Sequence, residues 1–184
     1  MFIGSQKRKE NIAEYLLYMW QIEDIIRAYD LDIEKIKEHI IDKSSLDEEQ
    51  RRQMTEWYES LIDMMHREGV EKSGHLQMNR NVLSQLIELH NALLKDPRFG
   101  DYTRKFYAAL PVIVDLRSKA GDNPKGEIET CFDALYAMLL MRMSGREISA
   151  STENAIKSIA QFIAVLANNF HLDEKNELFK DEDS

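Results

Sequence analysis

The sequence has few of the residues that tight turns and disulfides require. Its 184 residues include seven glycines, three prolines and one cysteine, Cys131. Scarce glycine and proline argue against a loop-rich β fold, because such folds need turn residues at short intervals. A single cysteine excludes an intrachain disulfide, so the chain does not have the disulfide framework of small secreted domains.

Long uncharged runs and large basic clusters are also missing. The nearest approach to a membrane span, residues 12–29, contains four charged side chains, whereas a span needs roughly 18 uncharged residues. The N-terminus shows no uncharged core of a signal peptide. The net charge is −9, and the basic side chains that nucleic acids require cluster only at residues 7–9. We therefore expect a cytoplasmic protein that binds neither nucleic acid nor membranes.

The sequence is rich in apolar residues spaced three and four apart, which is the period of an amphipathic helix. We predict an all-α, single-domain bundle of six or seven helices over residues 1–172, followed by a frayed acidic tail, 173–184. Pro111 lies inside one helix and should kink it. The expected helices cover about 6–29, 33–41, 46–68, 75–95, 102–119, 127–143 and 151–169.

The helix expected from Glu127 to Met143 is apolar over most of its circumference, which is typical of a buried helix. We expect the other helices to pack around it, and we assign Leu135 to the core. Two local signals set helix ends: Ser45 and Glu48 are spaced as a capping box, and Gly69 can adopt a left-handed C-terminal turn.

Two stretches carry a resemblance to known proteins: residues 11–24, NIAEYLLYMWQIED, and the methionine-rich residues 137–145, AMLLMRMSG. In these, and in its length, the chain resembles an all-helical family from Bacteroidetes, about 180 residues long, known only as a domain of unknown function. The resemblance covers the whole chain and implies a helical fold. It implies no activity, because it contains no catalytic motif.

No motif predicts catalysis, a cofactor or a metal. Di-iron helical bundles need paired Glu-x-x-His motifs, and the closest match here is Asp63 with His66. Glu56 and Glu59, with Asp63, resemble half of a magnesium-binding pyrophosphohydrolase motif, without the second half. All these side chains lie on one polar helix face, which solvent exposure explains better. We therefore assign no catalytic, cofactor-binding or metal-ligating residue, and the chain is more typical of a binding protein than of an enzyme.

Four polar side chains project from apolar helix faces and form a candidate polar cluster: Glu23, Arg27, Arg142 and His90. Charges on apolar faces cost free energy unless they are paired. One interpretation is structural: a Glu23–Arg27 pair, Arg142 reaching solvent at its helix end, and His90 satisfied inside the core. The other is a pocket between the helices at 6–29 and 127–143 that binds a small anion on Arg27 or Arg142.

Two classes of function follow. The first is a non-catalytic interaction or scaffold module that self-associates, with a further protein partner left open. The second is an enzyme or metabolite-binding protein that uses the candidate polar cluster. The helices at 6–29 and 127–143 carry more apolar surface than one packing face needs, and Trp20 lies at its edge. This predicts a homodimer through either helix, unless other helices of the same chain cover the surface.

Overall fold

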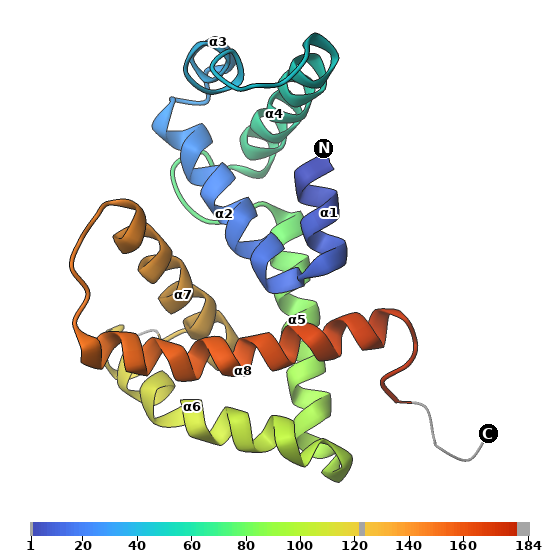
Figure 1. Ribbon diagram of the computed structural model, residues 1–184, viewed down its shortest axis with the longest axis vertical. Coiled ribbons are helices and arrows are strands. Elements are labelled where there is room, and N and C mark those ends of the chain that lie inside the picture. Colours follow the sequence, from blue (N-terminus) through green and yellow to red (C-terminus); the bar gives the residue numbers. More distant parts are fainter. Residues whose placement is uncertain (1, 122–123, 180–184) are drawn as a thin grey trace. The chain divides into compact units, whose positions relative to one another are not determined.

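A computed structural model describes residues 2–121 and 124–179. Over these residues the protein is all-α, as the sequence predicts, with eight α-helices and no strand (Figure 1). In the same residues, every helix is too short or too polar to cross a membrane. The helices fall into two compact units: unit 1 contains Met1–Glu10 and Glu14–Val82, and unit 2 contains Asn11–Ala13 and Leu83–Ser184.

Unit 1 contains the first four α-helices and the start of the fifth. In chain order they are α1 (Phe2–Glu10), α2 (Ile12–Ala28), α3 (Ile33–Ile36), the π-helical turn η1 (Lys37–Ile41), α4 (Glu48–Glu68) and α5 (Gln77–Lys95). Helix α4 packs against α3 and η1. The core of the unit draws aromatic and aliphatic side chains from α2, α4 and the loop before α5, including Leu16, Met19, Ile26, Leu61, Met65 and Leu76.

The single helix expected at 6–29 is divided at Asn11. Helix α1 ends at Glu10, and the Asn11 side chain accepts a hydrogen bond from the backbone N–H of Ala13, at 3.0 Å. Asparagine is a strong helix N-cap because its short side chain can satisfy a free amide of the first turn. A cap residue between two apolar stretches therefore starts a second helix where periodicity alone predicts one continuous helix.

Helix α4 begins with a capping box two residues later than expected. The cap is Asp47, whose carboxylate accepts from the Gln50 N–H at 2.8 Å, while the Gln50 side chain accepts from the Asp47 N–H at 3.0 Å. The predicted Ser45–Glu48 pair has the same spacing, so spacing alone does not select between them. The other end agrees with the sequence: Gly69, at φ 68°, closes α4 in the left-handed conformation.

Unit 2 contains the rest of α5, the 3-10 turn η2 (Pro97–Phe99), α6 (Gly100–Lys119), α7 (Glu127–Met143) and α8 (Ala150–Glu174). Helix α8 packs against both α6 and α7, which also contact each other (Figure 1). Pro111 lies inside α6, which continues through it to Lys119. The core consists mainly of large apolar and aromatic side chains, including Tyr102, Phe106, Ile113, Phe132, Ile159, Phe162 and Leu166.

Helix α7 is most deeply buried near its N-terminal end. Ile128, Cys131 and Phe132 are buried, in agreement with the sequence, whereas Leu140 and Met143 near its C-terminal end are exposed. Leu135, expected in the core, is half-buried. The N-terminal turns are thus enclosed from several sides, whereas the C-terminal turn is not, so this helix is not buried along its whole length.

Helix α8 and the segment after it extend the described structure to residue 179. Helix α8 continues to Glu174, beyond the expected boundary at 172, and the Phe179 ring contacts the Phe99 ring with centroids 5.5 Å apart. An isolated aromatic in an acidic tail can pack on the domain and hold the preceding residues. The prediction of fraying for residues 180–184 concerns a part outside the described residues.

Candidate functional site

Glu23, on α2, is fully buried in unit 1 and accepts three hydrogen bonds. Its Oε1 accepts from the Leu76 backbone N–H at 2.9 Å and from the Asn79 side-chain amide at 2.6 Å. Its Oε2 lies 2.6 Å from His75 Nδ1. Leu76 directly precedes α5, so the carboxylate satisfies a backbone amide at the start of that helix. The sequence predicts that the Glu23 charge is paired, with Arg27 as its partner. The carboxylate is indeed satisfied, but by these three other donors.

His75 connects this buried carboxylate to the surface of unit 1. Its side chain is about one quarter exposed, and its ring stacks on the Trp20 indole with centroids 4.2 Å apart. Because Oε2 is an acceptor when Glu23 is ionised, the proton between the two groups lies on His75 Nδ1. The stack and the hydrogen bond together fix the imidazole plane and explain why Trp20 is buried.

Arg27 does not pair with Glu23. It forms an ion pair with Asp24 at 2.9 Å, and its Nη2 donates to the backbone carbonyls of Val70 and Gly74. The guanidinium thus fastens the loop between α4 and α5 to α2. Because two of its donors are engaged by carbonyls and it also faces a carboxylate, Arg27 is a poor receptor for a small anion.

His90, on α5, is buried in unit 2 with 3% of its surface exposed. Its Nδ1 lies 2.6 Å from the Tyr102 hydroxyl, and the rings of Phe106 and Phe162 pack edge-on against it. Its Nε2 forms no hydrogen bond within the described residues and lies 3.8 Å from a carboxylate oxygen of Glu127. Burial lowers the pKa of His90, while Glu127 opposes that shift. A neutral core imidazole results.

The neighbours of His90 are also held in their neutral forms. Burial raises the pKa of the Tyr102 phenol, and it raises the pKa of the Cys131 thiol to about 12. The nearby Glu127 carboxylate adds to the shift of Cys131. A thiol with so high a pKa is a small apolar group rather than a nucleophile, as the sequence predicts for Cys131.

The four residues of the candidate polar cluster lie in both units. Glu23 and Arg27 belong to unit 1, and His90 and Arg142 belong to unit 2. Arg142 is exposed in the last turn of α7, where a positive charge is favoured by the helix dipole. Each of the other three meets partners of its own unit, so the contacts that hold them are structural ones.

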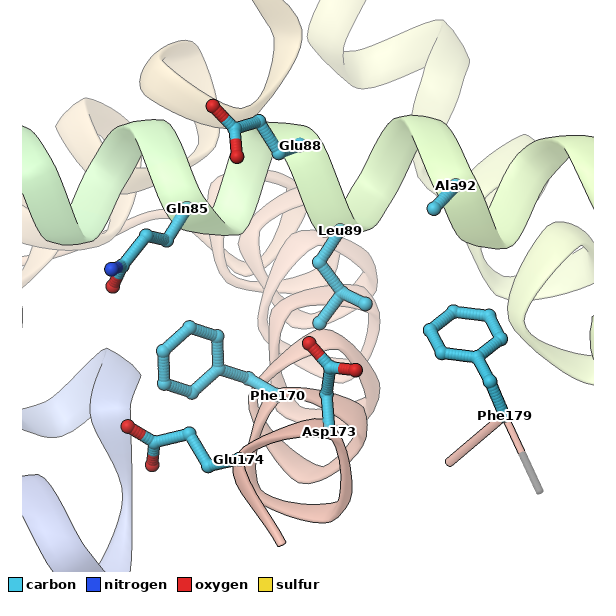
Figure 2. A pocket seen from close by; sticks show the side chains of 8 residues that line it. All are labelled: Gln85, Glu88, Leu89, Ala92, Phe170, Asp173, Glu174 and Phe179. Carbon is cyan, nitrogen blue, oxygen red and sulfur yellow. The ribbon is translucent and has the colours of Figure 1, made fainter. Parts of the chain in front are cut away.

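A pocket of about 350 Å³ lies in unit 2 between α5 and the end of α8; we call it the α5–α8 pocket. Figure 2 shows the Asp173 carboxylate pointing toward Leu89 and the rings of Phe170 and Phe179 on its two sides. Glu174 lies beside Phe170, whereas Glu88 points to the other side of α5 in this view. The complete lining is Gln85, Glu88, Leu89, Ala92, Phe170, Asp173, Glu174 and Phe179.

Three carboxylates are among the eight residues that line the pocket, yet they do not form a metal site among the described residues. Over residues 2–121 and 124–179, no group of three or more His, Cys, Asp or Glu side chains could hold a metal ion. The Asp63, His66 and Glu59 side chains that were weighed as ligands lie exposed on α4, as expected for a polar face. The pocket therefore offers apolar surface with negative charge at one side.

Over the described residues the protein is all-α, with a buried polar network in each unit and a small pocket between α5 and α8. The chain belongs to the family described as Domain of unknown function (DUF4924), whose model matches residues 1–177. One family model therefore spans helices of both units. No curated protein and no solved structure was found to match the chain.

Sequence reasoning missed His75 and Asn79 as partners of Glu23, and it missed the α5–α8 pocket. The only signal for the first was the requirement that a charge on an apolar stripe be paired. Nothing local identifies residues 52 and 56 positions further along the chain as the partners. For the pocket, the available signal was Phe179, the one aromatic residue within the acidic C-terminal segment.

Proposed function

We propose that the protein is a non-catalytic helical interaction module that self-associates through an exposed apolar surface on α6. One observation carries this proposal: Tyr107, Pro111 and Val114 are all exposed on the same helix. We call these three residues the α6 stripe. Exposed apolar patches on proteins of this size usually mark a contact with a partner.

The α6 stripe suits a second copy of the same chain. Spacings of four and three residues place its members on one helix face, with 61% of Tyr107 and 54% of Val114 exposed. Two copies of α6 crossing antiparallel at Leu110 and Pro111 set each Tyr107 opposite Val114 of the second copy. A two-fold axis makes such a surface complementary to itself, and dimers of this symmetry are the commonest homo-oligomers.

The apolar surface of α2 supports this choice of helix. Trp20 is buried against His75, and the Tyr18 ring stacks on Trp57 with centroids 6.5 Å apart, so unit 1 itself covers both rings. Of the two helices expected to form the dimer, α7 retains exposed apolar residues, Leu140 and Met143. We propose that these extend the contact surface beyond the α6 stripe.

Light scattering after size exclusion tests self-association. We expect a mass of about twice 21.5 kDa at micromolar concentration, and a return to 21.5 kDa in Val114→Glu. The control is Lys105→Glu, which adds negative charge to α6 at an exposed position away from the stripe. A native chain that is monomeric throughout, or a Val114→Glu variant that keeps the doubled mass, contradicts the proposal.

A second candidate function is the binding of a small metabolite, and the α5–α8 pocket favours it. Its volume, about 350 Å³, lies at the lower end of the range of roughly 300–1,000 Å³ for ligand sites. Neither arginine of the small-anion hypothesis, Arg27 or Arg142, lines this pocket, whose acidic side chains are Glu88, Asp173 and Glu174. The pocket therefore favours a ligand other than a small anion.

We place this activity in the cytoplasm, since the one cysteine is a buried free thiol and the framework needs no disulfide. We retain an origin in Bacteroidetes as an expectation from the resemblance of residues 11–24 and 137–145. Detection of the protein in the soluble fraction of lysed cells, with none exported, tests the location.

A further inference from the structure

We propose that the α5–α8 pocket binds an organic cation of the alkylammonium class. The inference rests on the second candidate function and supplies its ligand class, and it is independent of self-association through the α6 stripe. It is argued from the charges, the rings and the size of the pocket.

The negative charge of the pocket has two sources. Asp173 and Glu174 are the last two residues of α8, where the unpaired carbonyls of the final turn already carry partial negative charge. A carboxylate at this end of a helix is electrostatically unfavourable, and a cation placed beside Asp173 relieves its repulsion from these carbonyls. Within the residues that the structure describes, Asp173 forms no ion pair, so its carboxylate is available to a ligand.

The aromatic rings favour an organic cation over a hydrated inorganic one. Phe170 and Phe179 flank Asp173 (Figure 2), and Leu89 and Ala92 complete the apolar wall. Phenyl faces attract ammonium groups, and the methyl groups of an alkylated ammonium also bury apolar surface against them. A metal ion would instead require several converging oxygens, and no such group of ligands is present among the described residues.

The probes should separate charge from shape. Choline carries a quaternary ammonium, cadaverine carries primary ammonium groups, and 3,3-dimethyl-1-butanol has the shape of choline without its charge. We expect saturable binding of choline or cadaverine by calorimetry, at least about tenfold tighter than that of the neutral alcohol, since a charge-assisted contact is lost. Preference for choline assigns the site to methylated ammonium, and preference for cadaverine assigns it to free amines.

Three variants locate the site. Asp173→Asn should weaken binding about tenfold by removing the facing charge. Phe179→Ala should weaken it severalfold; this ring is 40% exposed, so its loss should leave the fold intact. The control, Glu153→Gln, removes an equal charge from the other end of α8 and should leave binding unchanged.

Three results overturn the proposal: equal affinity for choline and the neutral alcohol, no saturable binding of either cation by the folded native chain, or equal effects of Asp173→Asn and Glu153→Gln. Circular dichroism of each variant confirms that the helices are retained. None of these substitutions lies on the α6 stripe. The mass in solution, measured by light scattering, should therefore be the same for the native chain and for every variant. Loss of cation binding and loss of self-association are therefore separately observable.

Discussion

His90 shows how a polar residue can sit as a neutral imidazole in a core of rings. The sequence predicts its inward direction because it lies on the apolar face of its helix. It does not predict the partner, Tyr102, which is twelve residues further along the chain on α6. A helical period gives the direction of a side chain, whereas its partner depends on which helices pack together. For the same reason, Glu23 was expected to be paired, but with Arg27 rather than with His75 and Asn79.

The lowered pKa of His90 predicts a pH dependence of stability. Because the folded pKa lies below the unfolded value of about 6.5, the unfolded chain binds more protons in acid. This contribution is fully present above about pH 6.5 and is lost as the pH falls below it. We expect His90→Phe to lose less stability than the native chain between pH 7.5 and 5.0, measured by urea unfolding.

The control for this measurement is Ser84→Ala, which replaces an exposed residue on α5 that does not titrate and should keep the native pH dependence. His90→Phe also loses the bond to Tyr102, so its stability should be lower at every pH, and the difference between the two pH values is the informative quantity. A native and a His90→Phe chain that lose equal stability between these pH values would contradict the role assigned to burial.

At the scale of elements, helix starts depend on side chains that the helical period does not reveal. Asn11 divides the first predicted helix, and Asp47 rather than Ser45 caps α4. The start of α5 depends on Glu23, which comes from a different helix. Periodicity therefore predicted where the helices lie. Local cap residues determine where two of them begin, and the Glu23 carboxylate satisfies a backbone amide at the start of α5. Only the local caps could have been read from the sequence.

Glu23 should therefore contribute strongly to the stability of unit 1. Glu23→Gln keeps the side-chain shape, but it replaces one acceptor oxygen by an NH2 group that is itself a donor. At least one of the buried donors that now bind Glu23 is then left unsatisfied. We expect the free energy of unfolding to fall by about 2–4 kcal/mol. The matched substitution Glu59→Gln, on the exposed face of α4, should change it by less than about 0.5 kcal/mol. Equal effects in denaturant melts would show that the Glu23 contacts add little.

At the scale of the whole molecule, the all-α class followed from the scarcity of glycine and proline together with the helical period. The two compact units were not predicted, because Val82 and Leu83 are neighbours on one continuous helix, α5, and no linker separates them. The α6 stripe escaped notice for another reason. Tyr107, Pro111 and Val114 look apolar enough to be core residues, and only the packing of unit 2 leaves them exposed.

The net charge of −9 gives the two proposed interactions opposite responses to salt. Two copies of the chain repel each other, so screening by salt should strengthen self-association through the apolar α6 stripe. The same screening should weaken an ammonium ligand beside Asp173. We expect the dimer fraction to rise and the affinity for choline to fall as the NaCl concentration is raised from 20 to 500 mM. This range lies on both sides of 0.1 M, at which the Debye length is roughly 10 Å. If the dimer fraction and the affinity for choline both rose or both fell with salt, either the proposed dimer surface or the proposed cation site would be wrong.

The burial of Cys131 makes the native protein behave as if it had no thiol. Its sulfur is fully enclosed, and a pKa of about 12 leaves almost no thiolate at neutral pH. A cysteine introduced at an exposed position, such as Ser118 on α6 or Lys72 in unit 1, would then be the only site that maleimide reagents modify. Fluorescent or spin labels can thus be attached to either unit without first removing the natural cysteine.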